Sequence, residues 1–335
     1  MGHATRSQPI IEHLKKRHKV RIFAGGKALP YLRRYFSVHW LASTHLVYRD
    51  NAVHDVRSVL LNIVRSPLYA VSFISLLCVM LFRRPDVLIT DFEPWSAWAA
   101  MLTGVPVVSI ALPACESREA STFPQRHRGS HRKMHAVARA FIPRADAVVM
   151  PSFFVPAGMD ARVQPVKPVI RAELASRTPT SGAHVLVYQT SSSNQRLLNA
   201  LKSFPRQQFV IYGFPRDDRD ANLRFKRFNE KEFFDDLASA KAVIANGGLS
   251  LLCEALYFRK PVLSIPVAGQ CEQIINAHYL EKLGYGMTAR EATPAVLKRF
   301  FSQLQRQREA LKKPVASNLP SVFTTIDKVL NDVAQ

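Results

Sequence analysis

The chain has 335 residues, with 46 Lys and Arg against 25 Asp and Glu, which gives a formal charge of +21. Apolar residues make up 47% and aromatic residues 10%, so a sizeable core can form and wholesale disorder is excluded. The length suggests about two domains. Four cysteines (Cys78, Cys115, Cys253 and Cys271) lie far apart without a C-x-x-C pair, which excludes a disulfide scaffold and a cysteine-built zinc site and fits a reducing compartment.

The excess positive charge indicates attraction to anions. The sequence has no zinc-finger spacing, basic zipper heptads or RNA-binding signature, so no specific nucleic acid is expected as a partner. An anionic membrane surface is the other candidate. Because the segment Met1–Lys19 is polar, it predicts no signal peptide. We therefore expect a cytoplasmic protein that is peripheral on the cytoplasmic face of the membrane.

Short β-branched runs alternate with helical patterns in the first half of the chain, which is typical of parallel α/β sheets. The first helix is expected over Gln8–Lys16. Strands are expected at Val20–Ala24, Val38–Leu41, Val87–Thr90, Val105–Ala111 and Ala147–Pro151.

No strand precedes this first helix. In a doubly wound domain, a Gly-bearing turn that leads into the first helix normally follows a central strand. Either the polypeptide begins at this turn, without the first strand of the domain, or its true start lies upstream of Met1, which is the interpretation we favour. We expect coding sequence upstream of Met1 to supply about five apolar residues and glycines.

The longest charge-free apolar stretch, Ser66–Phe82, is closed by Arg83 and Arg84. It contains Pro67 and lies at the lower length limit for a helix that spans a membrane. The pattern favours a helix that is buried in a core or lies on a membrane over one that crosses it.

The segment 158–182 is rich in Pro, Arg, Thr and Ser, which predicts a linker between a first domain over 1–157 and a second over 183–316. A final helix within 317–335 is expected to pack back on the rest of the chain. Strands of the second domain are expected at Val185–Gln189, Phe209–Gly213, Leu223–Phe228, Ala242–Ala245 and Val262–Pro266.

Two glycines, Gly247 and Gly248, follow the fourth expected strand of the second domain, and a helix starts near Leu249 and Ser250. Glycines allow a ligand to approach the backbone, and the free N–H groups and dipole of a helix start favour an anion such as a diphosphate. The Ser250 hydroxyl can donate as well. Glu254 lies four residues later on the same helix face, where a carboxylate can accept from a ribose diol. A tight turn followed by a solvated Glu is the alternative.

The last expected strand ends at Pro266, and Glu272 and Gln273 then open a helix. Ligands of open α/β sheets bind at the carboxyl edge of the strands, where this pair is expected. A carboxylate and a carboxamide together can accept from and donate to sugar hydroxyls.

The order G-G-x-S-x-x-x-E, K-P-V-L-x-I-P and E-Q-x-x-N-A within residues 240–287 resembles the donor half of GT-B glycosyltransferases, most closely the MurG-like (glycosyltransferase family 28 C-terminal-like) group. The resemblance implies an α/β fold of two facing Rossmann-like domains with a cleft between them, the first for the acceptor and the second for a nucleotide-sugar donor. It also implies the donor-binding residues: Gly247, Gly248, Leu249 and Ser250 for the diphosphate, Glu254 for the ribose, Glu272 and Gln273 for the sugar.

Two motifs of the first half resemble the same group: Gly2-His3-x-x-Arg6 and Asp91-Phe-Glu93-Pro. In such enzymes the G-H-x-x-R turn faces the acceptor. His3 can deprotonate an acceptor hydroxyl, or His3 and Arg6, with Gly2, can bind an anionic group of the acceptor. Asp91 and Glu93 can orient His3 or act as the base themselves, and Asp91 is alternatively a helix cap.

The resemblance also bears on the reaction. Retaining members of the fold commonly carry a second Glu eight residues before the ribose-binding one; here Asn246 stands at that position, which implies inversion. No spaced D-x-D pair is present, so we expect no metal and no cofactor beyond the nucleotide-sugar. The expected function is glycosyl transfer from a nucleotide-sugar, with UDP favoured, to a lipid-linked or cell-envelope acceptor. A nucleotide-sugar epimerase or hydrolase of the same fold and a non-catalytic polyanion-binding protein are the alternatives.

Overall fold

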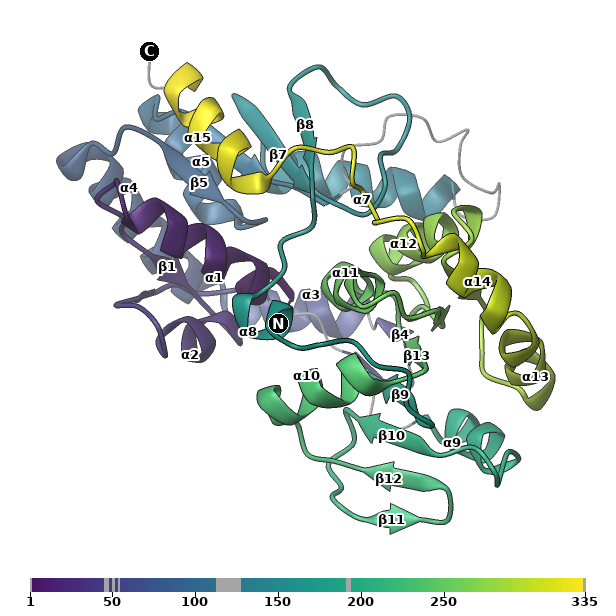
Figure 1. Ribbon diagram of the computed structural model, residues 1–335. Helices are drawn as coiled ribbons and strands as arrows, with labels where there is room; N and C mark the ends of the chain where they lie inside the picture. Colours follow the sequence, from purple (N-terminus) through teal and green to yellow (C-terminus); the bar gives the residue numbers. More distant parts are fainter. Residues whose placement is uncertain are drawn as a thin grey trace. The chain divides into compact units, whose positions relative to one another are not determined.

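A computed structural model describes residues 2–44, 48–49, 52–53, 55–112, 128–190 and 194–333. The chain divides into two compact units (Figure 1). Unit 1 comprises 1–47, 54–169 and 316–335, and unit 2 comprises 48–53 and 170–315.

Unit 1 is built on parallel strands. Four of them pair in chain order: β5 (Leu88–Thr90), β6 (Val107–Ile110), β7 (Ala147–Pro151) and β8 (Val163–Val166). A separate parallel pair consists of β1 (Phe23–Ala24) and β2 (His39–Trp40). Every residue of β6 and β7 is buried, which fits their near-continuous apolar sequences, because parallel sheets are covered on both faces.

The helices of unit 1 are α1 (Gly2–Lys15), α2 (Ala28–Leu32), α3 (Asp55–Val64), α4 (Ser66–Arg83), α5 (Pro94–Thr103), α7 (Arg128–Phe141) and α15 (Val322–Val333). The last of these, α15, lies beside α1 (Figure 1, yellow and purple) and closes one core cluster of the unit. In that cluster Ile326 and Val329 of α15 pack with Ile10 of α1 and with Val108 and Val149 of the sheet. Helices α1 and α15, which are far apart in the sequence, therefore contribute to the same hydrophobic core of unit 1.

Unit 2 contains a seven-stranded sheet in the order β11-β12-β10-β9-β13-β14-β15, parallel except for β11. Its strands are β9 (Val185–Tyr188), β10 (Phe209–Tyr212), β11 (Arg219–Asp220), β12 (Leu223–Phe225), β13 (Ala242–Ala245), β14 (Val262–Ser264) and β15 (Gly286–Thr288). Its helices are α8 (Ala172–Ala175), α9 (Gln195–Lys202), α10 (Glu230–Ser239), α11 (Leu249–Tyr257), α12 (Cys271–Lys282), α13 (Pro294–Ser302) and α14 (Leu304–Ala310). A short antiparallel pair, β3 (Tyr48–Arg49) and β4 (Ala52–Val53), is grouped with this unit.

Each strand expected from the sequence is present, most of them shorter, but other elements differ from the prediction. Helix α1 begins at Gly2 rather than at Gln8, so the G-H-x-x-R motif forms its first turns instead of a preceding loop. Pro9 lies inside the helix. The burial of Ala4 and Ile10 on either side of Pro9 outweighs the cost of a proline in a helix interior.

Five of the strands in the described structure were missed: β3, β4 and β11, which have two residues each, and the two longer strands β8 and β15. Residues 158–182, expected to be a linker, contain β8 as well as α8. Pro165 argued against a strand here, because proline has no N–H to donate to a neighbouring strand. It is tolerated in β8 because β8 is the edge strand of its sheet. Strand β15 begins at Gly286, where a Cβ atom would lie 2.0 Å from the Val262 carbonyl oxygen.

The packing of α15 gives a first prediction. Ile326→Ala should destabilise unit 1 by about 2–5 kcal/mol, because it leaves a cavity in a fully buried cluster. Lys328→Ala, on the exposed side of the same helix, should leave the free energy of unfolding nearly unchanged. Chemical denaturation of the two variants measures the difference; equal stabilities would mean that α15 does not pack as described.

Candidate functional site

Strand β13 leads into helix α11 through the two glycines. Gly247 has φ +96°, and a Cβ atom there would lie 2.7 Å from Ser264 Oγ and 3.0 Å from the Gln273 carbonyl oxygen, so this position requires glycine. Gly248 caps α11 with an ordinary φ of −62°, and a Cβ there would meet no atom within 4 Å in the described part of the chain. Leu249, buried, and Ser250, half-buried, follow in the first turn, whose amides have no acceptor within the helix. A helix start of this kind favours an anion.

Two buried asparagine side chains, Asn276 and Asn246, fix this turn by hydrogen bonds to the backbone. Asn276 Nδ2, from α12, donates to the Gly247 carbonyl oxygen at 3.0 Å. Asn246 Nδ2 donates to the Ile265 carbonyl at 3.1 Å, while its Oδ1 accepts from the Thr190 N–H at 2.7 Å. Asn246 thus ties the ends of β9, β13 and β14 together. The sequence analysis assigned neither role, although Asn276 is the Asn of the E-Q-x-x-N-A motif.

Glu254 is buried against an arginine. Its Oε1 accepts from Arg171 Nη2 at 2.7 Å and from Arg171 Nε at 3.2 Å, and the two side chains are only 8% and 7% exposed. Arg171 also pairs with Glu230 and lies over the Phe234 ring. Burial raises the pKa of Glu254, and the Arg171 charge opposes that rise. Since both hydrogen bonds use Oε1, Oε2 is the oxygen left for a ligand among the described residues.

The sequence analysis missed Arg171. It lies within the segment expected to be a linker, and no motif marks it. Only the fold brings it next to Glu254.

Glu272 and Gln273 begin α12, as the motif predicts, but they differ in accessibility. Gln273 is buried, and its Oε1 accepts from the Val267 N–H at 2.9 Å, which leaves the side-chain NH₂ as a donor. Glu272 is half-buried in the first turn of the helix. Burial, together with the Glu272 charge, raises the pKa of the neighbouring Cys271 to about 12, so that thiol is not a nucleophile at neutral pH. Glu272 is thus the accessible acceptor of the pair.

In unit 1 the structure brings His3, Arg6 and Asp91 together. His3 Nδ1 lies 2.7 Å from Asp91 Oδ1, and Arg6 Nε donates to Asp91 Oδ2 at 2.8 Å while its Nη2 contacts Oδ1. The Ser7 hydroxyl donates to the same carboxylate at 2.9 Å. Gly2 begins the helix that carries these groups, and its carbonyl accepts from Thr5 Oγ at 3.0 Å.

The ionisation of Asp91 follows from these contacts. Burial alone would raise its pKa, but the charges of Arg6 and His3 and their hydrogen bonds outweigh burial and hold the pKa well below the usual range. Because an ionised carboxylate only accepts hydrogen bonds, the His3 proton is assigned to Nδ1. In the neutral form of His3 the lone pair then lies on Nε2 of a ring whose side chain is 47% exposed. This is the arrangement of a histidine base held by a carboxylate.

The turn after Asp91 is strained and capped. Phe92 has φ +59°, which is unfavourable for a residue with a side chain, and its ring stacks near His3 with centroids 6.3 Å apart. Both carboxylate oxygens of Glu93 accept hydrogen bonds from backbone N–H groups of α5, one from Trp95 at 3.1 Å and the other from Ser96 at 2.7 Å. The helix cap that the sequence suggested for Asp91 is therefore Glu93, because Asp91 is occupied by Arg6 and His3.

A cavity of about 350 Å³ in unit 1 adjoins this turn. Its lining contains both apolar and charged residues: Phe92, Ser109, Ala111, His135, Ala138, Arg139, Ile142, Pro143, Ala145, Val148, Asp160 and Arg162. Arg162 is paired with Asp160 at 3.1 Å. The cavity thus offers cationic groups beside the His3–Asp91 pair.

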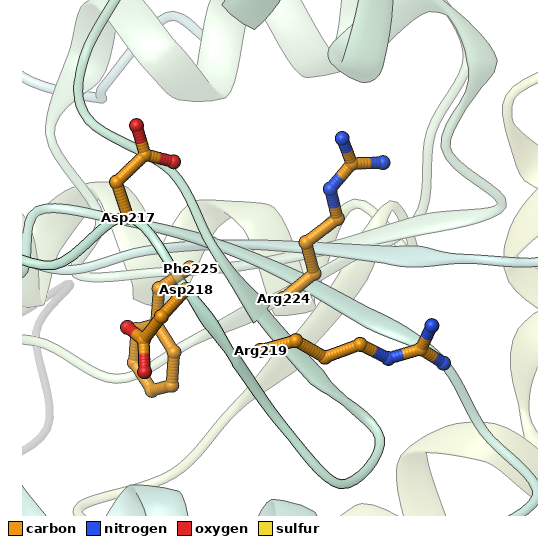
Figure 2. A pocket seen from close by; sticks show the side chains of 5 residues that line it. All are labelled: Asp217, Asp218, Arg219, Arg224 and Phe225. Carbon is orange, nitrogen blue, oxygen red and sulfur yellow. The ribbon is translucent and has the colours of Figure 1, made fainter.

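A second hollow, of about 290 Å³, lies at β11 and β12 of unit 2. Figure 2 shows that Asp217, Arg219 and Arg224 point in different directions there rather than toward one point. The sheet order separates β12 from β13 by two strands, so this hollow is not part of the Gly247–Gly248 site. Over the described ranges, no group of three or more His, Cys, Asp or Glu side chains is arranged to hold a metal ion.

The profile described as Glycosyl transferase family 1 matches residues 1–305. The chain belongs to this glycosyltransferase family. Over 73 residues it is 42% identical to an uncharacterized glycosyltransferase of Methanosarcina acetivorans, a match of 22% of this chain and 19% of that protein. Over 104 residues it is 32% identical to the UDP-N-acetylglucosamine--N-acetylmuramyl-(pentapeptide) pyrophosphoryl-undecaprenol N-acetylglucosamine transferase of Geobacillus thermodenitrificans, covering 28% of this chain and 29% of that one. These matches therefore span less than a third of either relative.

Solved structures resemble the glycosyltransferase over nearly its whole length. Phytolacca americana UGT2 has a TM-score of 0.69 at 15% identity, covering 99% of this chain and 96% of that one. MurG of Acinetobacter baumannii has a TM-score of 0.61 at 16% identity, with coverage of 99% and 96%. The α/β fold of the GT-B class and the resemblance to the MurG-like group are confirmed.

The two glycines of the glycosyltransferase should respond differently to substitution. Gly247→Ala should destabilise unit 2 by about 1–3 kcal/mol, because alanine is strained at φ +96° and its Cβ meets Ser264 and Gln273. Gly248→Ala should cost less than about 1 kcal/mol, because its Cβ enters open space. Equilibrium unfolding compares them; equal losses would refute the description of the turn.

Arg171→Met should destabilise unit 2 by about 3–5 kcal/mol at neutral pH, because it leaves the Glu254 carboxylate buried without its cation. The pKa of Glu254 is higher in the folded protein than in the unfolded chain. The folded protein therefore keeps its full stability below the pKa that Glu254 has when unfolded, and it loses stability as the pH rises and Glu254 ionises. The defect should therefore be smallest near about pH 4 and grow toward neutrality.

Adding Glu254→Gln to Arg171→Met should restore part of the stability at neutral pH. Arg177→Met is the matched control, because Arg177 pairs with Asp235, whose side chain is 54% exposed, and should cost at most about 1 kcal/mol. Urea unfolding across pH measures all three. A pH-independent defect in Arg171→Met would contradict this electrostatic account.

Proposed function

We propose that the protein transfers a glycosyl residue from a UDP-sugar to a lipid-linked acceptor of the cell envelope, with inversion at the anomeric carbon. The observation that carries the proposal is the glycine turn at Gly247 and Gly248 that leads into α11, with space beside Gly248 and with Glu254 one turn further along the helix. The names of two similar proteins support the nucleotide and the acceptor class. One is the Geobacillus enzyme already described, and the other is the Arabidopsis thaliana UGT89C1 solved in complex with UDP.

In the proposed donor site, the amides of Gly248, Leu249 and Ser250 hold the diphosphate, and the helix dipole offsets its charge. Oε2 of Glu254 accepts from the ribose, while Arg171 fixes the carboxylate through Oε1. Glu272 accepts from a hydroxyl of the donor sugar, and the side-chain NH₂ of Gln273 donates to another. No metal is required in this scheme, because the helix start stabilises the leaving diphosphate.

In the proposed reaction, Nε2 of His3 removes the proton of the acceptor hydroxyl while Asp91 holds the imidazolium that forms. The acceptor oxygen forms a bond to the anomeric carbon as the bond from that carbon to the UDP oxygen breaks, and UDP leaves with the electron pair. One displacement inverts the configuration. Asn246, at the position where a retaining enzyme carries a carboxylate, bonds the Thr190 N–H, the Ile265 carbonyl and the Gln189 side chain and supplies no carboxylate. Glu93 is assigned to the helix cap.

The acceptor in this proposal carries an anionic group. Arg6 is buried and committed to Asp91, so the cations offered to an acceptor are those of the cavity beside Phe92, Arg139 among them. A phosphate or diphosphate linkage between a lipid and a sugar fits such a cavity. We place the protein on the cytoplasmic face of the membrane, in line with its charge of +21.

The test compares donor binding with turnover. UDP-sugars should raise the unfolding temperature in a salt-resistant way, and Gly248→Ala should weaken UDP-sugar binding about tenfold while lowering the stability of the free protein by less than about 1 kcal/mol. Asp91→Asn should bind the donor normally but release UDP about 100-fold or more slowly. Asp217→Asn, in the hollow at β11 and β12, is the matched control and should change neither property.

Binding that is salt-sensitive and independent of the base would instead support a polyanion-binding protein. Retention of configuration in the product would refute the single displacement. An unchanged rate of UDP release in Asp91→Asn would contradict the proposed role of His3, supported by Asp91, as the base.

A further inference from the structure

Helix α4 has one face fixed to unit 1. Tyr69, Ser72, Leu76 and Met80 recur along one stripe and are buried. The Ser72 hydroxyl accepts from the Ala42 N–H at 2.9 Å, and the Tyr69 ring stacks on Trp95 of α5 with centroids 5.2 Å apart. The helix therefore lies along unit 1 over its whole length.

The opposite side of α4 is apolar and uncovered in the described structure. Leu68, Val71, Ile74, Leu81 and Phe82 are between 45% and 80% exposed. Only 22% of this 18-residue helix is buried, although by length and composition it could cross a membrane. Large exposed apolar surfaces of this kind mark contact sites.

Helix α3 extends the same surface. Leu60, Ile63 and Val64, at its C-terminal end and just before α4, are between 58% and 77% exposed. We call the exposed apolar residues of α3 and α4 together the apolar face.

Positive charges border the apolar face. The sequence from 55 to 86 contains Arg57, Arg65, Arg83 and Arg84 against Asp55 and Asp86 at its two ends, so its net charge is +2. Arg57 is exposed on α3, and Arg83 and Arg84 are exposed at the end of α4. An apolar surface with a cationic border is complementary to the headgroup region of an anionic membrane.

We infer that the apolar face docks the protein on an anionic lipid surface, with α3 and α4 lying in the plane of the interface. Spanning is disfavoured, because it would remove Leu76 and Met80 from the cluster that they form with α5. A second copy of this chain is a poorer occupant, because a two-fold contact would bring together the arginine-bordered surfaces of two copies, which repel each other. The inference deepens the proposed function by naming the surface that meets the lipid carrying the acceptor, and it rests on that function only for the identity of the acceptor.

Sedimentation with vesicles tests the charge requirement. The full chain should bind vesicles of mixed phosphatidylcholine and phosphatidylglycerol and bind phosphatidylcholine alone weakly. Arg57→Glu with Arg83→Glu should weaken binding to the mixed vesicles by at least about 100-fold. Lys298→Glu with Arg299→Glu, exposed on α13, changes the net charge equally and should change binding by less than about threefold.

The apolar contribution is tested separately. Ile74→Ser with Phe82→Ser should weaken binding to the same vesicles about tenfold or more while leaving the unfolding temperature unchanged, because both side chains are exposed in the folded protein. Equal losses in the two charge-reversed proteins, or full binding by the serine variant, would overturn the inference. Concentration-dependent dimerisation that the serine variant abolishes, without vesicle binding, would assign the face to a second copy and overturn it as well.

Cys78 reports the depth of insertion directly. It is exposed on α4, whereas Cys253 and Cys271 are buried, so a polarity-sensitive fluorophore can be placed on it after Cys115→Ser. The emission should shift to the blue on addition of the mixed vesicles, and an unchanged spectrum would contradict insertion.

Donor binding is measured in parallel to separate the two proposals. If the charge and serine variants keep their stabilisation by UDP-sugar, their loss of vesicle binding concerns the docking surface alone. If the unmodified chain binds vesicles but no UDP-sugar, the proposed function fails and the docking surface stands.

Discussion

The donor side of the structure depends on a few amide hydrogen bonds behind the Gly247–Gly248 turn. The left-handed Gly247 directs its carbonyl oxygen into the protein, where an unpaired acceptor would cost about 1–3 kcal/mol. Asn276 supplies the donor. Asn246 joins the ends of three strands in the same region. Because these side chains are buried, the start of α11 is fixed before any ligand arrives, and its amides need no rearrangement to face an anion.

Each unit also buries a carboxylate against an arginine, with opposite results for its ionisation. Asp91 receives hydrogen bonds from Arg6, His3 and Ser7, and the charges and hydrogen bonds of Arg6 and His3 keep its pKa low and the carboxylate ionised. Glu254 shares Arg171 with Glu230, and its pKa is raised. The first arrangement suits a group that must stay charged to support an imidazolium. The second suits a group that must accept from hydroxyls while shielded from water.

The donor motif was readable from the sequence because its residues are close together in the chain. A glycine pair, a helix start and a glutamate one turn later obey local rules, and the structure places them as those rules require. Arg171 was not readable, because it meets Glu254 only through the fold and lies 83 residues away from it. The alternative in which Asp91 caps the helix was wrong for the same reason, since Asp91 pairs with Arg6 of helix α1, 85 residues earlier in the chain. Strand β8 was not predicted because it contains Pro165, and proline occurs in strands mainly at the edge of a sheet, a position that the sequence does not reveal.

The return of α15 to unit 1 has a consequence for biosynthesis. On the ribosome, every residue of the sheet and helices of unit 2 between 170 and 315 emerges before the residues that complete the core of unit 1. Vectorial folding usually lets the N-terminal domain finish first. Here the order is reversed, so the nascent N-terminal half must wait, with part of its interior open to chaperones, until the last helix has been translated.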